Sequence, residues 1–186
     1  MRLYALRHPV GTKAYLALAL LRYTGLARAD VVRFGRQHMS GTAITLPRQK
    51  TGVESEMVMV PELDAVLSRT PTAGPMVFLL TEHGRPFTPA GFGNWFADRC
   101  KEAGVPVRAH GLRKLAAATM AENGATDHQL MAWFGWKSIS EAQRYTKSAN
   151  RKRLAVMAAG YMEYAQGSEI GKPDAGLPIS DSKALK

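Results

Sequence analysis

The feature that most limits the fold is a change of hydrophobic period near residue 42. Residues 13–34 carry apolar side chains at helical spacing, whereas 42–46 and 56–60 are short, strand-like runs. Polar residues 48–52 lie between these runs, which predicts a β-hairpin with Lys50 at its bend. A further short strand is predicted over 76–81.

The other periodic segments predict helices. Thr88-Pro89 opens the clearest one, in which five apolar residues lie on one face before Gly104 ends it. Helices are also expected over 13–23, 28–34, 61–67, 110–122, 127–134 and 150–164, and a further helical segment that carries Tyr145 starts at a capping box at 138–141. The predicted fold class is therefore mainly α with a small antiparallel β-sheet (α+β). Residues 1–165 are expected to form one domain, and 166–186, rich in Gly, Pro, Ser and charge, a flexible tail.

Charge and cysteine content limit the partners and the compartment. The 186-residue chain has a formal net charge of +10, which attracts polyanions, of which nucleic acid is the commonest; an inert basic surface is the alternative. Cys100 is the sole cysteine, so no intramolecular disulfide can form and a reducing, cytoplasmic location is expected. The apolar run 14–21 is too short to span a membrane.

Four side chains could together act on a phosphodiester. His110 and Arg113 are three residues apart and thus share one face of a helix, while Tyr145 and Lys50 lie in basic segments. A hydroxyl attacks a phosphodiester well only where cationic donors neutralise the charge that develops on the phosphoryl oxygens. Each residue also has a plainer interpretation: His110 as a helix-start residue, Arg113 and Lys50 as solvated cations, and Tyr145 as a packed side chain.

Other kinds of enzyme lack support in the sequence. It contains neither a Gly-x-Ser-x-Gly elbow nor a Gly-x-x-x-x-Gly-Lys phosphate loop. The five histidines are scattered without the spacing of metal ligands, so no metal site is expected.

Five short motifs, in this order and spacing, resemble the catalytic domain of the tyrosine recombinases, the phage integrase family. The resemblance extends from about Pro9 to Leu154, and each motif is weak alone. The motifs are Thr24-Gly25 followed by Asp30, Gln49-Lys50-Thr51-Gly52, His110-Gly111-Leu112-Arg113, Gly135-Trp136-Lys137-Ser138 and Arg144-Tyr145-Thr146.

The resemblance implies a role for each matching residue. Tyr145 matches the nucleophile that forms a 3′-phosphotyrosine link, and Lys50 matches a lysine that protonates the leaving 5′-oxygen. Arg113 matches a catalytic arginine that donates to the non-bridging oxygens, and His110 a proton-transfer or phosphate-contacting group. Trp136 stands where many members have His; it can donate one hydrogen bond but cannot carry a proton. No cofactor is implied, because the phosphotyrosine bond conserves the energy needed for resealing.

One position departs from the family pattern. The first catalytic arginine corresponds to Ala27, which carries no charge. Arg28 is adjacent but points about 100° further round a helix, so it substitutes only if the backbone shifts. Loss of such an arginine can cost on the order of 10³–10⁵ in rate. Asp30 matches an acidic supporting position. Phosphate contacts outside the catalytic group are expected from Arg28, Lys114 and Lys137.

The sequence therefore predicts the catalytic domain of a site-specific DNA recombinase, impaired at Ala27. The resemblance implies three partners: an attachment site in double-stranded DNA, further copies of the chain that form a tetramer on that DNA, and a directionality factor. No membrane partner is expected. The N-terminal DNA-gripping domains of the family are expected to be absent. One alternative is an inactive DNA-binding protein on the same fold. The other is a basic helical domain whose motif matches are accidental.

Overall fold

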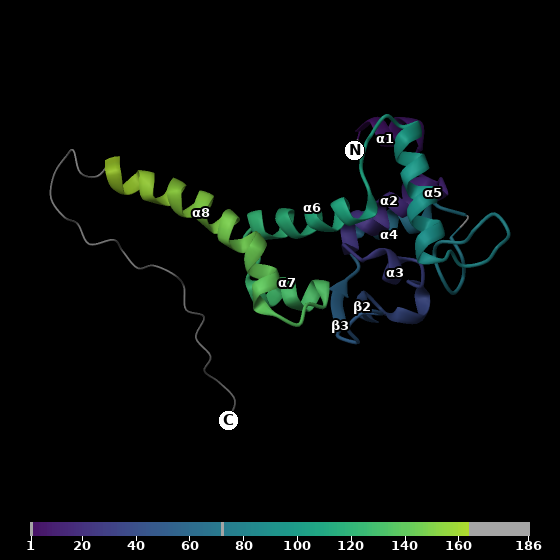
Figure 1. Ribbon diagram of the computed structural model, residues 1–186, viewed down its shortest axis with the longest axis horizontal. Coiled ribbons are helices and arrows are strands. Elements are labelled where there is room, and N and C mark those ends of the chain that lie inside the picture. Colours follow the sequence, from purple (N-terminus) through teal and green to yellow (C-terminus); the bar gives the residue numbers. More distant parts are fainter. Residues whose placement is uncertain (1, 72, 164–186) are drawn as a thin grey trace, which may run out of the picture. The chain divides into compact units, whose positions relative to one another are not determined.

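A small β-sheet and eight α-helices make up the described part of the computed structural model, residues 2–71 and 73–163 (Figure 1). The predicted fold class, mainly helical with a small antiparallel sheet, is confirmed. The elements are α1 Arg2–Arg7, α2 Lys13–Thr24, α3 Arg28–Val31, a 3₁₀ turn Arg36–His38, β1 Met39–Ser40, β2 Ala43–Pro47, β3 Glu54–Val58, α4 Pro61–Ser68, α5 Pro89–Glu102, α6 Ala109–Glu122, α7 Asp127–Phe134 and α8 Ile139–Glu163.

The predicted hairpin is confirmed, with Lys50 in its turn. Strands β2 and β3 are antiparallel, and Ile44 faces Met57 across the pair. Both of these side chains are buried, as the alternation of inward and outward residues in a strand requires. Strand β1 pairs with β2 and makes the sheet three-stranded. It was not predicted, because two residues are too few to show a period.

The helix boundaries follow the capping signals. The Thr12 hydroxyl accepts from the Tyr15 amide at the start of α2, and Gly25 ends that helix in the left-handed conformation at φ 62°. A capping box between Thr126 and Gln129 begins α7. These features, and the starts of α5 and α6, agree with the sequence-based expectation to within one residue.

Two apolar clusters hold the helices together. The larger is centred on α2, which packs against α4, α5 and α6. It includes Phe92, Phe96 and Cys100 of α5, so the predicted core role of that helical face is confirmed. The second joins α6, α7 and the first part of α8 through Ala117, Phe134 and other small or aromatic side chains.

Four further segments differ from the prediction. The strand expected over 76–81 is absent: this stretch is a loop with a single bridge between Leu80 and Pro86, and its Phe78 amide donates to the Phe34 carbonyl instead of to a strand. Its apolar residues anchor a loop in the core. Helix α3 is only four residues long, because the chain continues in tight turns. The two helices expected after residue 138 are one, α8, and α1 was not predicted.

The chain divides into two compact units, residues 1–152 and 153–186, and the boundary lies within α8. All the preceding elements belong to the first unit. In the second, the described residues 153–163 are helical, whereas the predicted tail 166–186 lies outside the described residues. Among the described helices, none has the length and apolarity needed to cross a membrane.

Gly25 is required for more than its backbone conformation. A methyl group at this position would collide with the Phe134 ring and lie 3.3 Å from Ala116 Cβ, whereas Gly104, also left-handed at φ 66°, has open space beside it. We expect Gly104→Ala to lower the free energy of unfolding by about 1 kcal/mol through backbone strain alone. Gly25→Ala should lower it by a further 1–3 kcal/mol or so, because the core must shift.

Urea unfolding of the two variants, followed by circular dichroism, measures this difference. Equal losses would contradict the close packing of α2 against α6 and α7.

Candidate active site

The carbonyl at the C-terminal end of α7 connects three parts of the fold. Carbonyls in the last turn of a helix have no partner within it, and Gly135 ends α7 in the left-handed conformation at φ 59°. The Phe134 carbonyl accepts hydrogen bonds from Arg48 Nη1 at 2.7 Å and from Arg113 Nη2 at 2.9 Å. One oxygen thereby holds the guanidinium of the hairpin beside that of α6.

Arg113 is fixed on several sides. Its side chain is 9% exposed, and Nη1 donates to the Gly25 carbonyl at 2.7 Å, at the end of α2. Its guanidinium carbon also lies 5.0 Å from the ring centre of Phe134 and 5.6 Å from that of Trp136. These contacts leave the guanidinium little freedom to turn.

Asp30 of α3 holds the other guanidinium. This carboxylate is 1% exposed and forms an ion pair with Arg48, Nε to Oδ2, at 2.6 Å. Its second oxygen accepts from the Gln49 amide at 2.8 Å, and Arg33 lies 3.6 Å from that same oxygen. Asp30 therefore positions the start of the hairpin turn as well as the Arg48 side chain.

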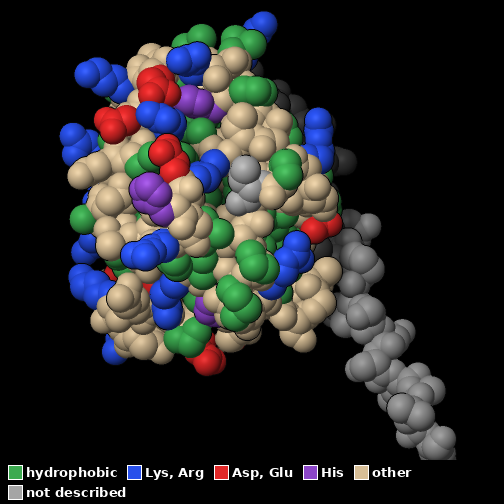
Figure 2. Space-filling view, turned by 90° about the vertical axis from the view of Figure 1, so that its right-hand side faces the viewer, with side chains coloured by type: hydrophobic (Ala, Val, Ile, Leu, Met, Phe, Trp, Pro, Cys, Tyr) green, Lys and Arg blue, Asp and Glu red, His purple; other side chains and the backbone are tan. Residues whose placement is uncertain are grey.

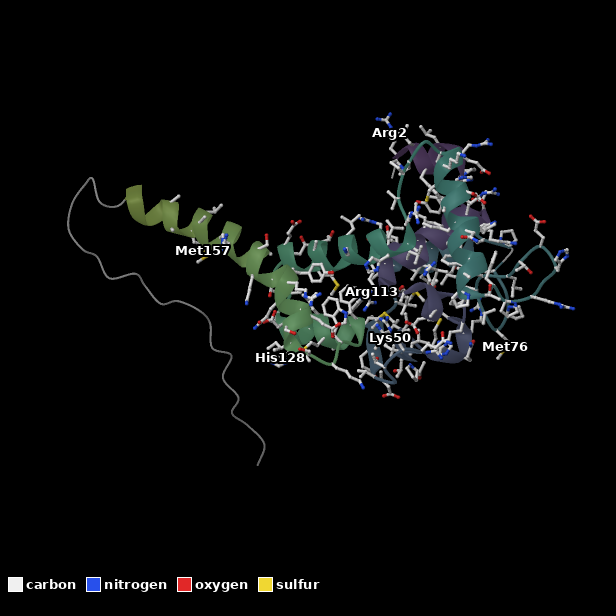
Figure 3. All side chains as sticks on the ribbon, in the orientation of Figure 1. Arg2, Lys50, Met76, Arg113, His128 and Met157 are labelled. Carbon is white, nitrogen blue, oxygen red and sulfur yellow. The ribbon has the colours of Figure 1, made fainter. Side chains whose placement is uncertain are left out.

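A cleft of about 450 Å³ lies over these groups and brings the five predicted catalytic residues together. Figure 3 labels Lys50 and Arg113, close to one another where α6 approaches the hairpin. The cleft is lined by Ala27, Arg48, Lys50, Thr51, His110, Arg113, Lys114, Gly135, Trp136, Glu141, Arg144 and Tyr145.

An aromatic stack sets the position of Tyr145 in the cleft. The Trp136 ring stacks on Phe134, with 4.8 Å between ring centres, and on Tyr145, at 5.5 Å and an interplanar angle of 5°. One residue further along α8, the Thr146 hydroxyl donates to Asp127 at 2.5 Å, at the start of α7. The stack and this bond together attach the tyrosine-bearing turn of α8 to α7.

The three predicted phosphate-contacting residues lie in different places. Lys114 lines the cleft. Arg28 is exposed and lines an adjoining hollow of about 720 Å³, where its guanidinium lies against Gly93 of α5. Lys137 is exposed but does not line the cleft.

The electrostatics of the cleft favour an anion. Five Lys and Arg side chains, His110 and one acidic side chain, Glu141, line it. Burial lowers the pKa of Arg113 to about 10, and repulsion from Arg48 acts in the same direction. Burial also lowers the pKa of Arg48, against the opposing effect of Asp30. Both guanidiniums stay charged at neutral pH, so an anion bound beside them would offset the free-energy cost of burying two positive charges and would reduce their mutual repulsion.

On the face shown in Figure 2, the basic side chains give no comparable signal. Lys and Arg are spread there among fewer Asp and Glu instead of gathering into one patch. The cleft is therefore a better guide to an anionic ligand than the net charge of +10.

Three cleft residues were missed in the sequence: Arg48, Glu141 and Arg144. Arg48 directly follows the first hairpin strand, two residues before Lys50, but the turn that follows it gives no period from which its direction could be predicted. Arg144 adjoins Tyr145, and Glu141 precedes it by one helical turn. Neither position distinguishes a cleft residue from a solvated one.

The fold recurs in solved structures of DNA recombinases. A lambda integrase dimer bound to a COC′ core site matches with a TM-score of 0.65 and 19% identity, over 78% of this chain and 56% of that one. XerA recombinase matches with a TM-score of 0.66 and 18% identity, over 90% of this chain and 62% of that one. The lambda integrase catalytic core matches with a TM-score of 0.61 and 16% identity, over 72% of this chain and 89% of that one. The chain thus spans 56–62% of the first two and most of a catalytic core. The search of curated proteins found no match.

This architecture is the fold of the solved recombinase catalytic core. The sequence agrees, because the profile of the phage integrase family matches residues 3–152. The chain therefore belongs to the phage integrase family, whose members break and rejoin DNA.

Asp30 should be essential to the stability of the site. Asp30→Asn leaves two buried guanidiniums without their carboxylate, so we expect a loss of about 3–5 kcal/mol in the free energy of unfolding. Asp64→Asn, the same change at an exposed position in the first turn of α4, should cost about 1 kcal/mol or less.

The double variant Asp30→Asn/Arg48→Met removes both partners and should regain part of that loss, as chemical unfolding of the four chains would measure. Similar losses for Asp30→Asn and Asp64→Asn would refute this account.

Proposed function

We propose that this chain is the catalytic domain of a site-specific recombinase that cleaves and rejoins double-stranded DNA through Tyr145. The observation that carries the proposal is the cleft itself. It joins a tyrosine to a buried arginine pair, a lysine and a histidine that come from the hairpin, α6 and α8. The cleft thus combines a hydroxyl nucleophile with the cationic donors that phosphoryl transfer to that hydroxyl needs.

In the cleavage step, Tyr145 Oη attacks the scissile phosphorus. The Oη–P bond forms as the P–O5′ bond breaks, which leaves a 3′-phosphotyrosine link and a free 5′-hydroxyl. His110 accepts the tyrosine proton, and Lys50 donates one to the leaving oxygen. Arg113 donates to the non-bridging oxygens, on which negative charge increases in the transition state.

The structure around these groups supports those assignments. Lys50 is exposed at the tip of the hairpin, so its flexible side chain can reach a strand of DNA above the cleft. Trp136 cannot carry a proton, and its stacking on Tyr145 gives it a positioning role. Rejoining reverses the same steps and needs no cofactor.

The proposed partners are an attachment site in double-stranded DNA and further copies of the same chain. Lambda integrase, similar in fold, has been solved as a dimer on a core site and as a tetramer on a Holliday junction. A strand exchange between two duplexes requires two cleaved strands at once, which favours the same assembly here. A directionality factor would be an additional partner.

A second candidate function is DNA binding without chemistry. Ala27 favours it, because the family places a catalytic arginine at that position. The two functions differ in one product, the covalent protein–DNA adduct.

We expect Tyr145 to form that adduct. The chain would be incubated with a pool of random-sequence duplexes, each nicked so that the short 5′-hydroxyl fragment is lost after cleavage. Protein-linked DNA is then isolated under denaturing conditions and sequenced. The unmodified chain should yield an adduct that enriches one sequence, and Tyr145→Phe should yield none. DNA binding without an adduct would favour the second candidate.

Lys50 should act through the leaving group. Lys50→Ala should slow cleavage of the selected DNA by about 10²–10⁴-fold, as loss of a general acid does. On DNA with sulfur in place of the scissile 5′-oxygen, the defect should largely disappear, because a thiolate leaves without protonation. Gln49→Ala, at the preceding position of the same turn and outside the cleft lining, is the matched control. A Lys50→Ala defect of equal size on both substrates would exclude the role of general acid.

A further inference from the structure

The hollow beside Ala27 is lined by an arginine from another part of the chain, Arg48. Ala27 contributes only a methyl group to the cleft and to the adjoining hollow. Arg48 and Arg113 line both of these spaces together with it. Position 27 therefore lacks the arginine that the family has there, but guanidinium groups from Arg48 and Arg113 line the space around it.

Two arginines are candidates for filling this place, and the structure distinguishes them. Arg28 is exposed, its guanidinium lies against Gly93 of α5, and it lines the adjoining hollow but not the cleft that holds Tyr145. Arg48 is 8% exposed and lines that cleft. Only Arg48, of these two, also contacts the oxygen that Arg113 contacts, the Phe134 carbonyl.

Arg48 keeps donors for a ligand. A guanidinium has five N–H groups. Its Nε faces Asp30 and one N–H of Nη1 is used by Phe134. The second N–H of Nη1 and both of Nη2 take no part in these two contacts. Arg48 and Arg113 share one acceptor and line the same cleft, so we expect their remaining donors to reach the two non-bridging oxygens of one phosphate.

The side chain reaches this place along a path that requires a glycine. A methyl group on Gly135 would lie 2.6 Å from Arg48 Cγ and 2.6 Å from Ser55 Oγ. The left-handed glycine that ends α7 thus leaves room for the stem of Arg48 as it crosses from the hairpin to the cleft. This close approach, with the Asp30 ion pair, fixes the guanidinium before any ligand arrives.

We propose that Arg48 is the second phosphate-binding arginine of this site, in place of the arginine that is absent at position 27. The identity of the phosphate as the scissile phosphodiester rests on the recombinase function proposed above. The existence of the anion site does not depend on that function. The charge balance supports it: among the described residues, Asp30 is the buried acid beside two buried guanidiniums, so a bound phosphate supplies the missing negative charge.

The first experiment measures anion binding without any DNA. Inorganic phosphate is titrated into the 186-residue chain at constant ionic strength, and the indole N–H signal of Trp136, which lines the cleft, is followed by NMR. Arg48→Met should weaken phosphate binding at least about tenfold, the effect of losing charged hydrogen bonds. Arg33→Met, the matched control, removes another arginine that contacts Asp30 but does not line the cleft, and should change binding less than twofold.

Stability is separated from binding by two further variants. Asp30→Asn/Arg48→Met leaves no unpaired carboxylate and should bind phosphate as weakly as Arg48→Met. Ala27→Arg/Arg48→Met returns a guanidinium to the family's position and should recover at least half of the lost binding energy. If folded Arg48→Met or folded Asp30→Asn/Arg48→Met binds phosphate as tightly as the unmodified chain, the proposal is wrong.

The second experiment tests the same residue in cleavage. With selected DNA, Arg48→Met should slow adduct formation on the order of 10³-fold. A methylphosphonate at the scissile position has one oxygen fewer to neutralise, so the defect should shrink at least tenfold on that substrate. A purely structural role would leave the ratio unchanged and would overturn the proposal. If Arg28→Met, and not Arg48→Met, caused the loss, the missing arginine would be replaced from α3 instead.

The two experiments separate the two proposals. Phosphate binding that depends on Arg48, with no adduct on any DNA, would keep the anion site and overturn the recombinase function. An adduct that depends on Tyr145, together with phosphate binding that is unchanged by Arg48→Met, would support the recombinase function and overturn the role of Arg48.

Discussion

The site depends on one backbone oxygen, the Phe134 carbonyl at the end of α7. A helix end leaves this acceptor free, and here it receives two guanidiniums, from Arg48 and Arg113. Cations are favourable at the C-terminus of a helix, so the partial negative charge there offsets part of their repulsion. The same interaction ties the hairpin, α6 and α7 to one point. The rest of the cleft is arranged around it.

Burial makes this interaction both costly and useful. Two arginines side by side in a poorly hydrated place would be unfavourable without compensation, and Asp30 provides one negative charge for both. The remaining imbalance is a preorganised attraction for an anion. Donors that are already fixed need no reorganisation when charge develops in a transition state, which is how electrostatic catalysis acts. As a consequence, the stability of the site depends on Asp30, the one buried carboxylate beside the two described guanidiniums.

Much of this could be predicted from the sequence, for identifiable reasons. Capping residues and hydrophobic period located α2, α5, α6 and α7, and the turn residues 48–52 located the hairpin. The segment 76–81 was mistaken for a strand because the apolar residues that anchor a loop, such as Phe78, have the same composition as a short buried strand. Strand β1 was too short to give any signal.

The candidate site was predicted where a residue's role depends on its own position in a motif, and missed where it depends on a contact. Lys50, His110, Arg113, Trp136 and Tyr145 do line one cleft. Arg48 escaped notice because its place is decided by Phe134, 86 residues away, and by the absence of a side chain on Gly135. Neither contact leaves a local pattern. A gap at one sequence position, Ala27, therefore does not establish a gap in the site, since a guanidinium can enter the same space from a different strand of the fold.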